Sequence, residues 1–260
     1  MPARRSLSRA SLAAAILSLG GCGGSSPTQP PAPAAPSPIA FASHESAHFV
    51  FRHMPLDAAT IAATAAAVEA QHARIADDLG VPGIPAVRVT LYPDADALRA
   101  GVAPIVGTIP GFASGLVTGP ADIHVLSPNL GAQWSYPVGV TAIVHEFAHC
   151  ASMRLNPSIA NNPRWLWESV ALYEAGQVVD PRTLAFMTAG QPPTLAELNR
   201  IEDARVYQVG GLIGAFVVDT WGREALRDLV RTNGRVQALG VDEAAFTSRW
   251  FAYARARYGF

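Results

Sequence analysis

One pair of predicted helices constrains the fold of this chain more than any other feature of its 260 residues. The stretch HEFAH places His145 and His149 four residues apart, so on a helix both imidazoles project from one face. Glu168 follows after eighteen intervening residues, on the next predicted helix, and the polar loop NPSIANN separates the two. Because the three side chains can meet only if the helices lie side by side and antiparallel, the sequence predicts a helical hairpin.

These residue types at this spacing indicate a catalytic metal site. Two imidazoles and a carboxylate supply the three protein ligands of a catalytic zinc ion, whose fourth position stays open for water. Glu146 is turned about 100° from its neighbours on a helix of 3.6 residues per turn, and from there it can reach a metal-bound water as general base. We therefore expect His145, His149 and Glu168 to bind Zn²⁺. The alternative is that the two histidines lie on a partly buried helix and bind no metal.

The rest of the sequence predicts an α+β fold with a mixed N-terminal half and an all-helical C-terminal half. Apolar periodicity and turn residues predict strands at 48–53 and 86–93, a hairpin at 111–127, and helices at 57–79, 94–101, 136–155, 163–175, 194–200, 203–221, 224–232 and 242–258. Asp57 and Asn162 are expected to cap two of these helices, and Gly80 to end the first. Gly210, Gly211 and Gly214 cost helix stability, so we expect another element to pack closely there.

The first 22 residues have the pattern of a bacterial export signal. Arginines precede a short apolar run, and the small residues of LGGC lead into Cys22 as in a lipobox, where the cysteine is lipidated. Residues 23–40, rich in Gly, Ser and Pro, form the expected tether, and 41–260 the expected folded domain. An ordinary cleaved signal peptide is the alternative. The pattern predicts a lipoprotein of the cell envelope that is anchored to a membrane. An aspartate after the lipidated cysteine would favour the inner membrane. Gly23 stands there instead, which favours the outer membrane if two membranes are present.

The charge of the chain argues against a nucleic-acid-binding protein, and its cysteine content argues against a fold held by disulfides. The chain has 19 basic and 20 acidic residues and no basic stripe, so nucleic acid is not an expected partner. With Cys22 lipidated, Cys150 has no partner for a disulfide, and we expect its thiol to be buried in the core.

Around the two predicted helices the chain resembles the gluzincin zinc peptidases of the MA superfamily, which include thermolysin-like and aminopeptidase-N-like enzymes. The resemblance rests on HEFAH, on the spacing to Glu168, and on WLWESVALYEA, which is similar to the W-L-x-E-G-x-A-x-Y pattern of that group. It is specific over 141–175 and loose over 41–260. It implies a zincin-like fold and zinc-dependent hydrolysis of peptide bonds, with the metal ligands and the base assigned as above.

Two positions depart from the patterns of that group. Ser169 replaces the glycine, and Leu172 stands where thermolysin relatives carry an aspartate that orients a zinc histidine, so Glu174 or another carboxylate is expected in that role. The resemblance also implies a tyrosine on a later helix that faces the metal and stabilises the oxyanion. Tyr207 is the candidate and Tyr173 its competitor.

The strand at 121–126 has two interpretations. In similar peptidases the strand before the zinc helix is a sheet edge to which an extended peptide adds, and an ordinary hairpin strand is the alternative. His124 within it is expected to lie at the surface or in packing. Trp165 and Trp167 are expected to wall the site and fill the core.

Together these observations predict a lipid-anchored zinc metallopeptidase that acts on a peptide or protein substrate. A non-catalytic lipoprotein that uses the same fold as a binding or scaffold module is the alternative. A metal carrier fits less well, because a carrier needs no glutamate placed for base chemistry.

Overall fold

A computed structural model describes residues 40–111, 113–131 and 134–260. The expected export signal, the expected lipidation site Cys22 and all but the last residue of the expected tether lie outside these ranges. Within them, no helix has the length and apolar character needed to cross a membrane.

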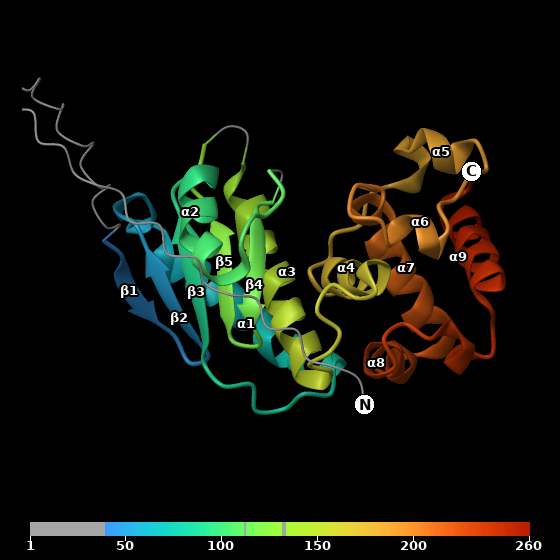
Figure 1. Cartoon of the computed structure of the whole chain (residues 1–260), viewed down its shortest axis with the longest axis horizontal. Coiled ribbons are helices and arrows are strands. Elements are labelled where there is room, and N and C mark those ends of the chain that lie inside the picture. Colours follow the sequence, from blue (N-terminus) through green and yellow to red (C-terminus); the bar gives the residue numbers. More distant parts are fainter. Residues whose placement is uncertain (1–39, 112, 132–133) are drawn as a thin grey trace, which may run out of the picture. The chain divides into compact units, whose positions relative to one another are not determined.

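Five strands form one mixed sheet (Figure 1). They are β1 (Ala42–Glu45), β2 (Phe49–His53), β3 (Val87–Tyr92), β4 (Gly115–Gly119) and β5 (Asp122–Leu126), in the order β1-β2-β3-β5-β4. The three inner strands run parallel, and β1 and β4 pair antiparallel at the two edges. The predicted hairpin is thus confirmed. Of the two interpretations of 121–126, the sheet edge is wrong and the ordinary hairpin strand is confirmed, because β5 pairs with β3 on one side and with β4 on the other.

Helices pack on both faces of the sheet. On one face, α1 (Ile61–Asp78) and α3 (Tyr136–Leu155) share the main hydrophobic core with the inner strands, and Phe49 and Phe147 meet there with ring centres 5.1 Å apart. On the other face, α2 (Ala95–Val106) covers Tyr92 with Leu98 and Val102. The bounds of α3 are those predicted, since its apolar pattern is strong.

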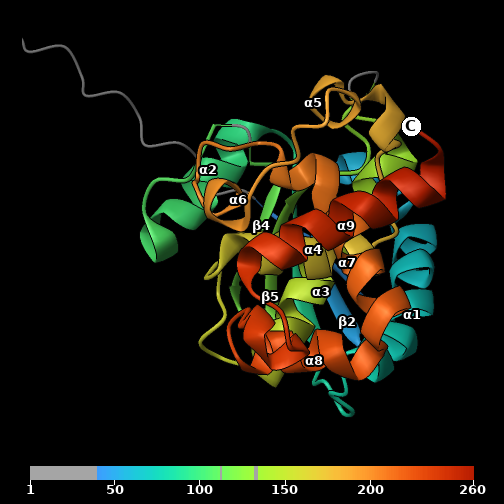
Figure 2. The same ribbon diagram turned by 90° about the vertical axis from the view of Figure 1, so that its right-hand side faces the viewer.

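The chain beyond α3 is helical, as predicted (Figure 2). Its helices are α4 (Arg164–Glu174), α5 (Ala185–Thr188), α6 (Leu195–Leu198), α7 (Val206–Trp221), α8 (Arg223–Arg231) and α9 (Glu243–Tyr258). Short 3-10 segments lie at Pro55–Asp57, Pro181–Thr183 and Val236–Leu239. The mixed sheet and these helices make the fold α+β.

Two of the expected helix caps are wrong. Asp57 is buried before α1, where its carboxylate accepts hydrogen bonds from Ser127 and, at 2.8 Å, from Asn129. Asn162 does not cap α4. In the first turn of that helix, the backbone N–H of Trp165 donates instead to the side chain of Asn199, at 3.1 Å. In both cases the hydrogen-bond partner is distant in sequence, which local cap patterns do not reveal.

The glycines of α7 allow α4 to approach closely, as predicted. A Cβ at Gly214 would lie 2.5 Å from the Cβ of Tyr173 and 2.8 Å from the carbonyl oxygen of Ser169. A Cβ at Gly211 would lie 2.2 Å from the carbonyl oxygen of Gln177. A Cβ this close to backbone atoms would clash, so larger residues are excluded at these positions. The glycines therefore let α4 and the segment after it lie between α3 and α7.

Candidate metal centre

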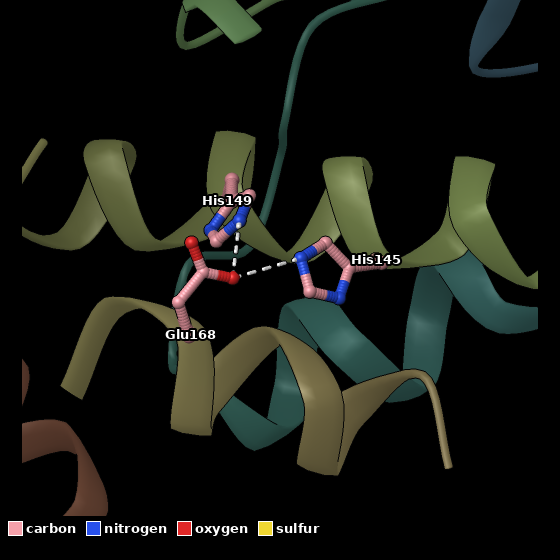
Figure 3. A group of neighbouring side chains, drawn as sticks. All are labelled: His145, His149 and Glu168. Atoms are coloured by element: carbon pink, nitrogen blue, oxygen red, sulfur yellow. Dashed lines mark ion pairs between the residues drawn. The ribbon is translucent and has the colours of Figure 1, made fainter. Parts of the chain in front are cut away.

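The helical hairpin of α3 and α4 brings His145, His149 and Glu168 together (Figure 3). All three are buried, and one ligand atom from each lies within 4.8 Å of the others. The Oε2 atom of Glu168 is 3.3 Å from Nε2 of His145 and 3.9 Å from Nε2 of His149. Ligands of a tetrahedral zinc ion lie about 3.3 Å apart, so one ion fits between these atoms with small shifts.

Unpartnered polar atoms support this fit. Oε2 of Glu168 is buried and accepts no hydrogen bond, although it faces two ring nitrogens, and Nδ1 of His149 is also buried without a partner. Buried polar atoms are almost always satisfied in proteins, and an ion between the ring nitrogens and the carboxylate would satisfy Oε2. Two imidazoles and one carboxylate are also a ligand set of known catalytic zinc sites, so these residues suit that ion.

Gln177, which the sequence did not single out, orients His145. Its Oε1 lies 2.8 Å from Nδ1 of His145, so the ring N–H donates there and the lone pair of Nε2 faces Glu168. The expectation that Glu174 does this is wrong: its carboxylate accepts from Arg74, at 2.7 Å. Gln177 follows the end of α4, and its side chain meets His145 only because of tertiary packing.

Aromatic packing holds the second histidine. The ring of Trp167 stacks on His149 with centres 3.9 Å apart and planes 5° from parallel, while Trp165 packs in the core against Phe246. The two tryptophans therefore wall the site and fill the core, as expected. Cys150 is fully buried, also as expected, and burial raises the pKa of its thiol well above the usual value.

Glu146 lies on the side of α3 that faces strand β4. A Cβ at Gly115 would be 2.6 Å from its Oε1, so the strand passes directly over the carboxylate. Burial, helped by the Glu168 carboxylate and opposed by His145, raises the pKa of Glu146 to about 7. A buried carboxyl with this pKa can both accept and return a proton near neutral pH.

The pKa values of the two histidines are shifted in opposite directions. Burial lowers the pKa of His149 well below its usual value, which keeps the ring neutral. Burial also disfavours protonation of His145, but the nearby carboxylates of Glu168 and Glu146 outweigh it and raise the pKa. Neutral imidazoles are the metal-binding form, and a bound cation would replace the proton at His145.

The cluster opens into a cavity of about 770 Å³. The cavity is lined by strand β4, by both ends of the α2–β4 connection, by α3 and α4, by the segment after α4 and by α7. Charged lining residues are few: besides the histidines they are Glu146, Arg164 and Glu168. A volume of this size suits a bound segment of several residues, and the predominantly apolar lining is typical of ligand sites.

Tyr207, on α7, is the tyrosine beside the cluster. Its hydroxyl donates to Oε1 of Glu168 at 3.4 Å, and the side chain lines the cavity. Burial, together with the charge of Glu168, raises its pKa to about 12, so the phenol keeps its proton. Tyr173, the competitor, packs against Gly214 and does not line this cavity.

Arg164, the first residue of α4, also lines the cavity and was not singled out in the sequence. It is buried, and its Cζ lies 5.2 Å from the ring centre of Tyr207. Its Nη1 donates to three carbonyl oxygens of the segment that leads into α7, those of Leu198, Arg200 and Asp203. Arg164 therefore fastens α4 to the start of the helix that carries Tyr207.

Three other histidines have partners away from the cluster. His124 is buried in β5 and shares a 2.9 Å hydrogen bond with the hydroxyl of Tyr92. His48 pairs with Glu69 and stacks on His72. In the described ranges, the cluster on α3 and α4 is the one group of side chains arranged to hold a metal ion.

The centre thus combines three potential metal ligands, a buried carboxyl and a phenol donor in one cavity. This arrangement can support metal-assisted hydrolysis, in which a carboxyl moves a proton and a phenol steadies developing charge. Comparisons of the chain with protein-family models, with curated proteins and with solved structures find no match.

Proposed function

We propose that this protein is a zinc-dependent peptidase with a zincin-like fold, exported and held on a membrane of the cell envelope through a lipid on Cys22. The observation that carries the proposal is the placement of Glu146, a buried carboxyl covered by strand β4, in the same cavity as the three candidate metal ligands. A binding module or a metal carrier has no use for such a carboxyl beside the ligands.

Each residue of the centre has a distinct part in hydrolysis. When bound by His145, His149 and Glu168, zinc would act as a Lewis acid on the peptide carbonyl and acidify the attacking water. Glu146 accepts the proton of that water and later delivers it to the leaving amine. Tyr207, whose hydroxyl reaches Glu168, donates a hydrogen bond to the oxygen on which negative charge develops.

In the ranges that the structure describes, no strand pairs with the outer edge of β4, and this edge can seat an extended substrate beside these residues. The N–H of Leu126 donates to the carbonyl of Ser114 at 2.8 Å, and Gly115 lies opposite Val125. Bonded and non-bonded pairs alternate along an antiparallel ladder, so the N–H and C=O groups of Gly115 and Val117 point away from β5. A peptide backbone can pair with them and pass directly over Glu146.

The change Glu146→Gln in the full chain tests the proposal. The amide keeps the shape of the side chain but cannot take up the proton, so hydrolysis of a mixture of unstructured peptides should fall by at least about 10²-fold. Zinc content, measured by elemental analysis, should stay at the wild-type level.

Glu243→Gln, at the exposed start of α9, is the control and should behave as wild type. Undiminished turnover in Glu146→Gln would contradict the mechanism. A wild-type chain that binds zinc but cleaves no peptide would favour the binding or scaffold alternative.

A further inference from the structure

The exposed apolar side chains of the protein are concentrated at one place. In the ranges that the structure describes, eight large apolar side chains are exposed, and six of them line the cavity of the metal centre. These six are Val106, Val138, Val178, Val179, Ile201 and Tyr207; we call them the apolar rim. The other two, Leu56 and Ile105, do not line it.

The apolar rim comes from separate elements of both halves of the fold (Figure 1). Val106 ends α2 and Val138 lies in the first turn of α3, whereas Val178, Val179 and Ile201 lie in segments that connect the later helices. Four stretches of the chain, at 106, 138, 178–179 and 201–207, thus leave apolar surface in water at the same cavity. Clustered exposure of this kind costs free energy in the unbound protein and marks a binding site.

We propose that the cavity selects extended polypeptide segments that carry large apolar side chains on both sides of the bond over Glu146. This inference rests on the proposed function and names its substrate class. Successive side chains of an extended segment point to opposite sides, so both walls of its site must be apolar. The rim residues of the N-terminal half and those of the C-terminal half supply these two walls.

Two features favour a polypeptide with apolar side chains over other occupants. The outward N–H and C=O groups of Gly115 and Val117 need a partner with alternating donors and acceptors, which a lipid chain does not offer. An acidic side chain would meet the carboxylates of Glu146 and Glu168, and the one cation among the described lining residues, Arg164, has Nη1 bound to three carbonyls and Nη2 buried without a partner. Two carboxylates against one guanidinium disfavour acidic substrate side chains.

Peptide binding to the full-length Glu146→Gln chain, loaded with zinc, tests the inference without turnover. The probes are two fluorescently labelled, end-capped hexapeptides, Gly-Leu-Phe-Leu-Ala-Gly and Gly-Ser-Asp-Ser-Ala-Gly, titrated to obtain Kd. The apolar peptide should bind at least ten-fold more tightly. Ile201→Ser should weaken its binding about five-fold, the effect of losing one apolar contact.

Ile105→Ser is the matched control. Ile105 is 57% exposed and Ile201 54%, and only Ile201 lines the cavity. Equal affinity for the two peptides, or equal losses in the two isoleucine variants, would overturn the inference. So would a change of oligomeric state in Ile201→Ser on a sizing column, because the rim would then be a contact between copies of the chain.

Failure of the proposed function gives a different result. If the apolar peptide binds selectively and the wild-type chain does not cleave it, the selectivity stands and peptidase activity does not. If the wild-type chain cleaves both peptides at the same rate, peptidase activity stands and the selectivity does not.

Discussion

At the scale of single residues, a neutral side chain orients one histidine of the candidate metal centre. Histidines that bind metal usually donate their second N–H to a carboxylate, a carbonyl or water, and His145 donates to the amide oxygen of Gln177. An amide holds the ring without adding negative charge to a cavity that already contains Glu146 and Glu168.

The change Gln177→Ala should therefore weaken zinc binding by about ten-fold, because the His145 ring loses its orientation. Competition with a chromophoric chelator measures the affinity directly and does not depend on activity. Gln177→Glu keeps the acceptor oxygen and serves as the control, with affinity at or above that of wild type. Unchanged affinity in Gln177→Ala would show that the ring is held by packing alone.

At the scale of elements, strand β4 approaches the candidate centre so closely that a side chain at Gly115 would displace the carboxylate of Glu146. A Cβ at Gly115 would meet Glu146, with 2.6 Å to Oε1 and 3.1 Å to Cδ, whereas a Cβ at Gly119 on the same strand has nothing within 4 Å. The two glycines serve different purposes: Gly115 leaves room for the carboxylate of Glu146, and Gly119 borders the hairpin turn.

We expect Gly115→Ala to lower kcat/KM for peptides by about 10²-fold, the order of loss that a displacement of about 1 Å causes in a catalytic group. Zinc content should not change, because Glu146 is not a proposed ligand. Gly119→Ala on the same strand should retain wild-type kcat/KM. If Gly115→Ala is fully active, the base does not act from the position seen beside β4.

At the scale of the whole described domain, a buried charge network joins α1, α4 and α8. Arg74 of α1 contacts both Glu174 of α4 and Asp78, which in turn pairs with Arg223 of α8 at 2.7 Å. Burial and the nearby Asp78 raise the pKa of Glu174 from 4.5 to about 7, although Arg74 opposes this. A raised pKa means that the protonated carboxyl stabilises the fold below pH 4.5 and that this contribution is lost as the pH rises through 7.

Glu174→Gln should accordingly be more stable than wild type at pH 8, by about 2 kcal/mol, and the difference should shrink toward pH 5. Urea unfolding of both chains at the two pH values, at equal zinc saturation, measures it. Exposed Glu243→Gln is the control and should show no widening difference. A variant less stable than wild type at pH 8 would mean that the pair with Arg74 outweighs the cost of burial.

The parts of this fold that the sequence predicts are those encoded locally. The bounds of α3 follow from its apolar pattern, and Asp94 caps α2 by accepting from the N–H of Ala97 at 2.8 Å, as an acidic residue before a helix should. Strand β1 was not predicted, because its four residues are mostly exposed and polar and show no alternation. Such an edge strand forms through backbone pairing with β2, which leaves no mark in a side-chain pattern.

The candidate site divides in the same way. HEFAH and the spacing to Glu168 place the potential ligands on a helical hairpin, so their meeting could be predicted. Gln177 and Arg164 could not, since each acts through a contact between segments that only the closed fold brings together. One of the two interpretations of 121–126 made it the edge strand, whereas β4 is the edge, because the order of strands in a hairpin does not determine which one joins the inner sheet.

Zinc content of the full chain, wild type beside Glu168→Ala, tests the central claim most directly. After saturation with zinc and removal of the excess, elemental analysis should find about one zinc per wild-type chain, which is the capacity of a three-ligand site. The Glu168→Ala chain should lose most of it, while Glu243→Ala keeps it. A wild-type chain that holds no zinc, or a Glu168→Ala chain that still holds one, would contradict the account.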